Sequence, residues 1–241
     1  MVKKTIYSIA LSAMLLLSSC GNGGLLGNLL GLGMPTTTTN TTGNVLGSVL
    51  GSVLGGMAGS GGGGLLGGML LTDNNTSSNL TDMVVGNAKL NKNDLVGTWI
   101  YAQPGCSFTN QSSLVNAGGA TAANQIKQKL NSTFKSLGFA SNNTGFAFDQ
   151  NGNFEGVLKG ASFNGTYTYD PSSGRLNLKT SGGVIPMFVT RVGNGLSFTM
   201  EAKVLTSVLQ ALSASGGNSA INALASQYNG VRMGFDMAKY K

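Results

Sequence analysis

Hydrophobic positions follow two different patterns on either side of residue 88. Before it, glycine recurs at every fourth position from Gly43 to Gly67, and Val-Leu pairs fill the first gaps. After it, apolar residues alternate with polar ones over short runs, and a few stretches show helical spacing instead. A period of two is typical of half-buried strands and i, i+4 spacing of helices. The pattern therefore predicts that 88–241 is one folded, mainly β domain behind a low-complexity segment.

Strand signals follow one another through this domain with tight turns between them. Asn151-Gly152 predicts a hairpin, Asp170-Pro171 begins another turn, and Pro186 suggests a strand edge or a bulge. The expected strands lie at 97–101, 146–148, 154–158, 163–169, 175–179, 184–191, 196–201 and 231–237. Seven or eight short antiparallel strands in sequence are typical of a meander that closes into a barrel.

Helical spacing interrupts the strands at two places. In 111–138, Ile126, Leu130 and Phe134 form an apolar stripe, and Lys127 and Lys129 lie off it. The stretches 203–213 and 218–228 are the other predicted helices. We therefore expect a barrel with inserted helices.

The N-terminus resembles the signal of a bacterial lipoprotein. Lys3 and Lys4 precede a short apolar run, and Leu17-Ser18-Ser19-Cys20 ends it. This predicts a signal peptide at 1–19 and an acylated Cys20, with palmitate as one expected acyl chain; an ordinary signal peptide is the alternative. Gly21 follows Cys20, so sorting to the outer membrane is expected, with the domain facing the periplasm. The membrane is thus an expected partner, through lipid and not through a spanning helix.

The segment 20–87 is expected to be a tether. No charged residue occurs from Thr5 to Thr72, and 43–71 contains 12 glycines. Each glycine costs a helix about 1 kcal/mol relative to alanine, which favours a disordered tether. A Gly stripe beside a Val/Leu stripe is also the small-xxx-small pattern of closely packed helices, so self-association through 43–71 is the alternative.

Several motifs of the domain resemble a family of lipocalin-like lipoproteins from Bacteroidetes that is known as a domain of unknown function. They are Leu95-Val96-Gly97-Thr98-Trp99, Pro104-Gly105-Cys106-Ser107-Phe108, Val115-Asn116-Ala117-Gly118-Gly119-Ala120, Gly165-Thr166-Tyr167 and Tyr228-Asn229-Gly230-Val231-Arg232-Met233-Gly234-Phe235. The resemblance covers about 90–241. It implies a lipocalin-like barrel with helical insertions and implies no activity.

Candidate chemistry is sparse. The chain has no histidine, so His-based triads and the common zinc sites are excluded. Cys106 is the one cysteine besides Cys20 and is interpreted as a buried small apolar residue. Glu155 and Glu201 fall between inward-type positions and are expected to face solvent. We expect no enzyme, no cofactor, no metal and no nucleic-acid partner, since the formal charge of +7, or +5 without Lys3 and Lys4, is spread along the chain.

The apolar face of the strands is the remaining candidate site. An eight-stranded barrel either is filled by its own side chains or holds one small ligand. Two hypotheses follow: a barrel that binds a small apolar or amphipathic molecule, and a filled barrel that acts as a structural or interaction protein. Candidate ligand-binding residues are Trp99, Phe146, Phe148, Tyr167, Tyr169, Phe198, Met200, Met233 and Phe235.

Overall fold

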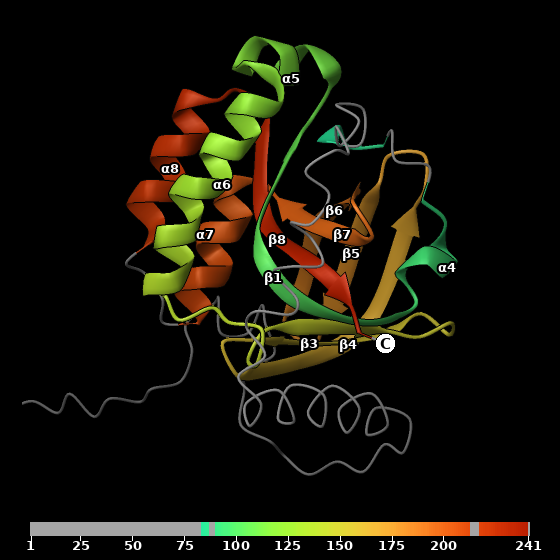
Figure 1. Ribbon diagram of the computed structural model, residues 1–241. Coiled ribbons are helices and arrows are strands. Elements are labelled where there is room, and N and C mark those ends of the chain that lie inside the picture. The colour runs from blue at the N-terminus through green and yellow to red at the C-terminus, as the bar shows by residue number, and fades with distance from the viewer. Residues whose placement is uncertain (1–82, 87–89, 213–216, 241) are drawn as a thin grey trace, which may run out of the picture.

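A computed structural model describes residues 83–86, 90–212 and 217–240, and these form a closed β-barrel with helices against one side (Figure 1). The predicted signal peptide, Cys20 and the Gly-rich segment 43–71 lie outside the described residues. None of the described helices is long and apolar enough to cross a membrane.

Eight antiparallel strands form the barrel in the order of the sequence, and β8 pairs with β1 to close it. This confirms the predicted antiparallel lipocalin-like barrel. The strands are β1 (Gly97–Phe108), β2 (Gly145–Phe148), β3 (Asn153–Leu158), β4 (Ala161–Asp170), β5 (Arg175–Thr180), β6 (Gly183–Val192), β7 (Gly195–Met200) and β8 (Val231–Lys239).

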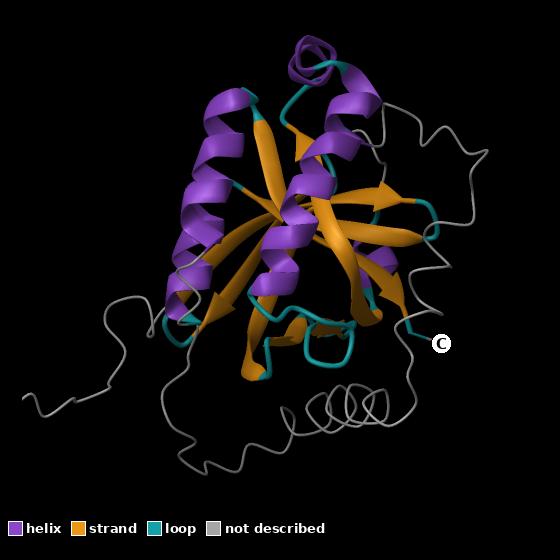
Figure 2. Ribbon diagram, turned by 60° about the vertical axis from the view of Figure 1, so that its left-hand side comes forward, coloured by secondary structure: helices purple, strands orange, loops and turns teal. Residues whose placement is uncertain are grey.

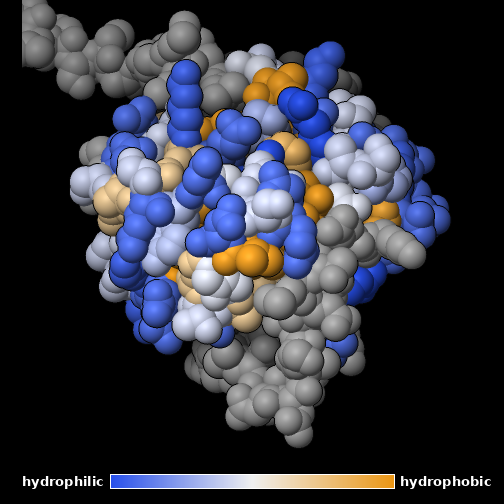
Figure 3. Space-filling model, turned by 90° about the horizontal axis from the view of Figure 1, so that it is seen from above, coloured by the Kyte–Doolittle hydropathy of each residue, from blue (hydrophilic) through white to orange (hydrophobic). Residues whose placement is uncertain are grey.

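The helices lie where helical spacing predicted them, between β1 and β2 and between β7 and β8. They are α5 (Gln111–Ala117), α6 (Gly119–Ser136), α7 (Ala202–Ala211) and α8 (Asn218–Gln227), and a short α4 (Lys92–Leu95) precedes β1. Figures 1 and 2 show α6, α7 and α8 as one layer beside β1 and β8, and the elements of this layer contact one another. The face seen from above is mostly hydrophilic, with small apolar patches between the polar side chains (Figure 3).

Alternation along the strands separates the barrel interior from its outside. In β4 the inward residues Phe163 and Tyr167 are buried, and their neighbours Asn164 and Thr168 are exposed. In β7 and β8 both faces are buried. These two strands therefore contribute to the interior on one face and to a second packed layer on the other.

The first strand is longer than the sequence predicted. β1 continues beyond residue 101 to Phe108, and its pairing with β8 shifts register between Tyr101 and Gln103. Such a bulge bends a strand and increases its twist. The alternation of inward and outward residues is interrupted at this bulge, which explains why the strand predicted from the sequence ended at residue 101.

Pro186 lies at a local edge, as its residue type suggested. It pairs with Asn177 of β5, whereas β7 begins to pair with β6 only at Phe188. The side of β6 that faces β7 is thus unpaired at Pro186, where the missing N–H costs no ladder hydrogen bond.

Residues 83–86 belong to the fold, although we assigned them to the tether. Val84 forms a parallel bridge with Phe108, and the N–H of Val85 donates to the carbonyl oxygen of Phe108 at 3.0 Å. Met83 and Val84 are buried in the hydrophobic cluster of the domain. The pairing with β1 is long-range in sequence, so local composition did not reveal it.

Candidate functional site

The structure brings the predicted ligand-binding residues together in the barrel interior. All of them are buried except Tyr169, which is partly buried. Phe198 lies at their centre: its ring centroid is 5.6 Å from that of Phe146, 5.7 Å from Phe148 and 6.3 Å from Trp99. These are contact distances for aromatic rings. The interior side chains therefore pack against one another.

Two polar atoms of this aromatic group have partners in the fold. The indole N–H of Trp99 donates to the carbonyl oxygen of Leu95 at 2.7 Å, and the hydroxyl of Tyr167 donates to the carbonyl oxygen of Asp149 at 2.7 Å. Trp99 and Tyr167 thus fix α4 and the β2–β3 turn against the barrel. Both hydrogen bonds therefore stabilise the fold.

A second aromatic group joins the barrel to α6. Phe134 of α6 and Phe139, which follows this helix, lie 5.5 Å and 5.3 Å from the ring of Phe235, and Tyr101 lies 6.1 Å from it. Burial raises the pKa of the Tyr101 phenol above its usual range, and Asp236 adds to this. The sequence showed Phe134 as part of a helical stripe, but only the fold shows that this stripe meets the inward face of β8.

A buried ion pair lies close to this group. The Nζ of Lys127 donates to Oδ2 of Asp236 at 2.7 Å, and Nε2 of Gln103 donates to the same oxygen at 3.1 Å. The Lys127 side chain is 15% exposed and Asp236 is 0% exposed. Burial alone would lower the pKa of Lys127, but the charge of Asp236 and its hydrogen bond raise it. Lys127 is therefore a charged, buried residue, which its position off the apolar stripe did not indicate.

The other side of the Asp236 carboxylate is tightly enclosed. Among the described residues, Oδ1 of Asp236 and Oγ of Ser197 are buried without a hydrogen-bond partner. A Cβ added to Gly105 would lie 2.8 Å from this Oδ1 and 2.6 Å from this Oγ. The glycine is thus required here by the close approach of β1 to the carboxylate, and the space holds no substrate-sized group.

Cys106 is buried and free, as its apolar neighbours in the sequence predicted. Burial raises the pKa of its thiol to about 12; Lys127 lowers this pKa and Asp236 raises it, both to a smaller extent. Since the thiolate is the nucleophilic form, this cysteine is unreactive at neutral pH.

Among the described residues, no three His, Cys, Asp or Glu side chains lie close enough to one another to hold a metal ion. Asp149 accepts hydrogen bonds from the backbone N–H and the side chain of Asn153 at 2.7 and 2.8 Å. Burial acts to raise the pKa of Asp149, but these hydrogen bonds lower it. Asp149 therefore stabilises the predicted hairpin turn.

Glu155 differs from the expectation that it faces solvent. Its Oε2 is buried without a hydrogen-bond partner, and burial raises its pKa to about 7. Glu201, by contrast, has a side chain that is 66% exposed, as expected. Alternation predicted the outward direction of Glu155 correctly but could not show that this part of the outer face is covered.

Glu155 makes the stability of the domain depend on pH. Its pKa is about 7 in the folded chain and 4.5 in a model compound, so the folded state binds more protons between these values. The contribution of Glu155 to the free energy of unfolding should therefore be fully present below pH 4.5 and should be lost as the pH rises through 7. Because the side chain is partly exposed, we expect a loss of about 1–2 kcal/mol. Urea unfolding at pH 5 and pH 8 measures this. Glu155→Gln should remove the difference in stability between pH 5 and pH 8, and Glu201→Gln should leave it. If this difference is the same in Glu155→Gln as in the parent, Glu155 is not the group responsible.

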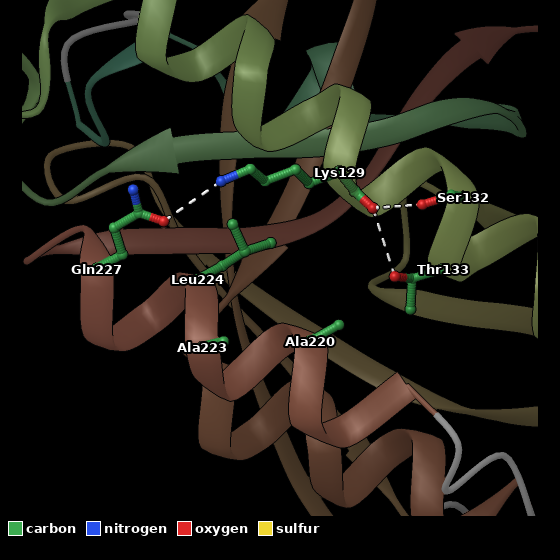
Figure 4. A pocket seen from close by; sticks show the side chains of 7 residues that line it. All are labelled: Lys129, Ser132, Thr133, Ala220, Ala223, Leu224 and Gln227. Carbon is green, nitrogen blue, oxygen red and sulfur yellow. Dashed lines mark hydrogen bonds between the residues drawn. The ribbon is translucent and has the colours of Figure 1, made fainter.

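A surface groove lies between α6 and α8 (Figure 4). Its volume is about 320 Å³, within the usual range for small-molecule sites. Nζ of Lys129 donates to Oε1 of Gln227 at 3.4 Å across the groove. The hydroxyls of Ser132 and Thr133 donate to the carbonyl oxygen of Lys129, at 3.0 and 3.4 Å. The lining residues are Lys129, Ser132, Thr133, Ala220, Ala223, Leu224 and Gln227.

The groove combines a polar edge with an apolar floor. Lys129 supplies a positive charge, and the two hydroxyl oxygens can accept hydrogen bonds. Ala220, Ala223 and Leu224 supply the apolar surface. An amphipathic molecule with an anionic or hydroxylated head group would complement this arrangement. This groove could not be predicted from the sequence, because its residues come from two helices more than 80 positions apart that meet only in the fold.

Comparison with known proteins identifies the domain. A family model described as "Lipocalin-like domain (DUF4923)" matches residues 69–239. No curated protein and no solved structure matches the chain. Lipocalin-like barrels can enclose a small ligand, so the match suggests ligand binding without identifying a ligand. With most of its length matched and an eight-stranded closed barrel, this chain belongs to the lipocalin-like family DUF4923, a domain of unknown function.

Proposed function

We propose that this protein is a lipid-anchored lipoprotein of the bacterial envelope that binds a small amphipathic molecule in the groove between α6 and α8. The protein is then a binding protein and not an enzyme. The outer membrane, with the domain facing the periplasm, is the proposed location. The groove carries the proposal, because it offers a charged and hydroxylated edge beside apolar side chains.

The barrel interior is the less favourable place for this ligand. Eight of the nine interior candidates are buried, and their rings already lie 5.0–6.3 Å apart. A ligand would have to displace contacts such as that between Phe148 and Phe198. In the groove, by contrast, Lys129 and Ala223 are exposed side chains, so no packed core has to open.

The proposed ligand site can be tested by native mass spectrometry of the full chain purified in detergent from envelopes. We expect extra mass that disappears on denaturation. Ala223→Trp fills the groove and should remove at least nine-tenths of the bound fraction. Asn222→Trp, an exposed neighbour on α8 that does not line the groove, is the matched control and should retain it.

The other outcomes assign the function differently. Extra mass that survives in Ala223→Trp would place the ligand elsewhere, and the barrel interior would become the next site to examine. A bare mass in the parent protein, also after incubation with an envelope lipid extract, would overturn ligand binding. It would favour the alternative of a filled barrel that acts as a structural or interaction lipoprotein.

The anchor has its own test. Acyl chains on Cys20 would hold the protein on the membrane, since each buried CH₂ contributes about 0.8 kcal/mol. Cys20→Ala should therefore move most of the protein from the membrane fraction to the soluble fraction, and Cys106→Ala should leave it bound. A membrane fraction unchanged by Cys20→Ala would argue against the lipoprotein anchor.

A further inference from the structure

Four apolar side chains form a patch on the outside of the barrel. Ala238, Ile100, Gly145 and Val157 make one row across β8, β1, β2 and β3, because Ile100 pairs with both Ala238 and Gly145, and Gly145 pairs with Val157. Ala147 lies two residues along β2 from this row. Ile100 alternates with the inward residues Trp99 and Tyr101, and Ala147 alternates with Phe146 and Phe148. The patch, defined as Ile100, Ala147, Val157 and Ala238, therefore faces outward.

This outward patch is nevertheless buried. Ile100 is 0% exposed, Ala147 1%, Ala238 3% and Val157 8%. None of the four belongs to the hydrophobic cluster that the interior and the helices form among the described residues. Glu155, which pairs with Ala147, has a buried carboxylate oxygen at the border of the patch. An apolar partner on this outer face accounts for both observations.

We propose that residues 69–71 of this same chain, the apolar triplet Met-Leu-Leu, dock on the outward patch. The direction in which the chain approaches β1 at Val84 supports this. Val84 pairs with Phe108 in the parallel sense, so the chain that precedes Val84 runs back along β1, from Phe108 towards Ile100.

The number of residues between the triplet and Val84 is also sufficient to reach the outward patch, and the same comparison excludes Leu80 as the occupant. Eight residues of β1 separate Phe108 from Ile100, which is about 26 Å. Thirteen residues separate Leu71 from Val84 and can span up to about 43 Å, so Leu71 can reach the patch. Leu80 is four residues from Val84 and reaches only about 13 Å. The intervening residues 72–79 are polar, as expected of a connection over the surface.

One further observation favours this triplet over the glycine repeats before it. The family model begins at residue 69, so the triplet is part of the family's domain, whereas the repeats from Gly43 to Gly67 lie before it. Like the repeats, the triplet carries no charge, so docking buries no ionised group. The tether between Cys20 and the domain then ends near residue 68.

Cysteine cross-linking in the full chain tests the docking. Leu70→Cys with Ala147→Cys, in a background of Cys20→Ala and Cys106→Ala, is oxidised under mild conditions in dilute detergent solution and analysed by non-reducing electrophoresis and mass spectrometry. We expect an intramolecular disulfide that forms at least ten times faster than in two control pairs. One control is Leu46→Cys with Ala147→Cys, which keeps the patch cysteine; the other is Leu70→Cys with Thr168→Cys, which uses an exposed outward position on β4.

Equal rates in the test and control pairs would overturn the proposal. A disulfide-linked dimer that grows with protein concentration would also overturn it and would make a second copy the occupant of the patch. Because Cys at position 147 could disturb packing, Met69→Ser/Leu71→Ser is a second variant. It should lower Tm by several degrees, whereas Leu46→Ser/Leu50→Ser should not; equal melting of the two variants contradicts docking.

Discussion

Replacing Lys127 by methionine should destabilise the domain by about 3–5 kcal/mol, although the new side chain is of similar length and apolar. The substitution leaves the carboxylate of Asp236, which is 0% exposed, without its counter-charge. Breaking a buried ion pair on one side costs this much because an ionised group remains in a poorly solvated place. Gln103 then donates the one remaining hydrogen bond that the described structure gives to Oδ2.

A second substitution separates the charge effect from a packing effect. Lys127→Met/Asp236→Asn removes both charges and keeps a side chain that can accept from Gln103, so it should recover all but about 1–2 kcal/mol. Lys129→Met, on the exposed face of the same helix, should change stability by less than about 0.5 kcal/mol. Urea unfolding of the four proteins measures these values. If Lys127→Met costs no more than Lys129→Met, the ion pair does not contribute as the geometry indicates.

Gly234→Ala should be at least as damaging, with a loss of about 4 kcal/mol or more. Gly234 lies in the centre of β8, where it pairs with Gly105 of β1 and with Thr199 of β7. An added Cβ would overlap the backbone oxygen of Phe198 and approach Cα of Thr199 to 2.9 Å. Neither group can move unless β7 separates from β8. A clash with backbone in a closed barrel therefore has no inexpensive relief.

Thermal unfolding followed by near-ultraviolet circular dichroism measures this loss, which should lower Tm by about 10 °C or more. The matched control is Gly160→Ala. Gly160 has a φ of +83°, but an added Cβ there meets nothing within 4 Å, so it should cost only about 1 kcal/mol of backbone strain. Similar Tm values for the two variants would show that β7 and β8 adapt to the methyl group.

The strands illustrate how far local pattern determines this fold. Alternation such as that of Phe163, Tyr167 and their polar neighbours predicted β4, and Asn151-Gly152 predicted the turn before β3. These signals are local, since side-chain direction follows from the pleat and turn type from a few residues. The extension of β1 to Phe108 was missed because a bulge interrupts the alternation there.

The candidate sites show where local pattern stops. The sequence correctly grouped the aromatic residues around Phe198, but both a filled and a ligand-holding barrel remained open, since the packing of rings depends on the distances between strands. The groove between α6 and α8 was not predicted at all. Lys129 and Gln227 lie 98 positions apart in the sequence and meet only because the two helices pack side by side.

The sequence by itself determined the order of the strands, the positions of the main helices, the burial of Cys106 and the absence of histidine chemistry. The tertiary structure alone decided that β1 continues past a bulge to Phe108, that Lys127 pairs with Asp236, that Glu155 is partly covered and that 83–86 join the fold. The division has one physical reason. Periodicity reports which way a side chain points from its own element, whereas burial, pKa and partner depend on whatever other element lies opposite.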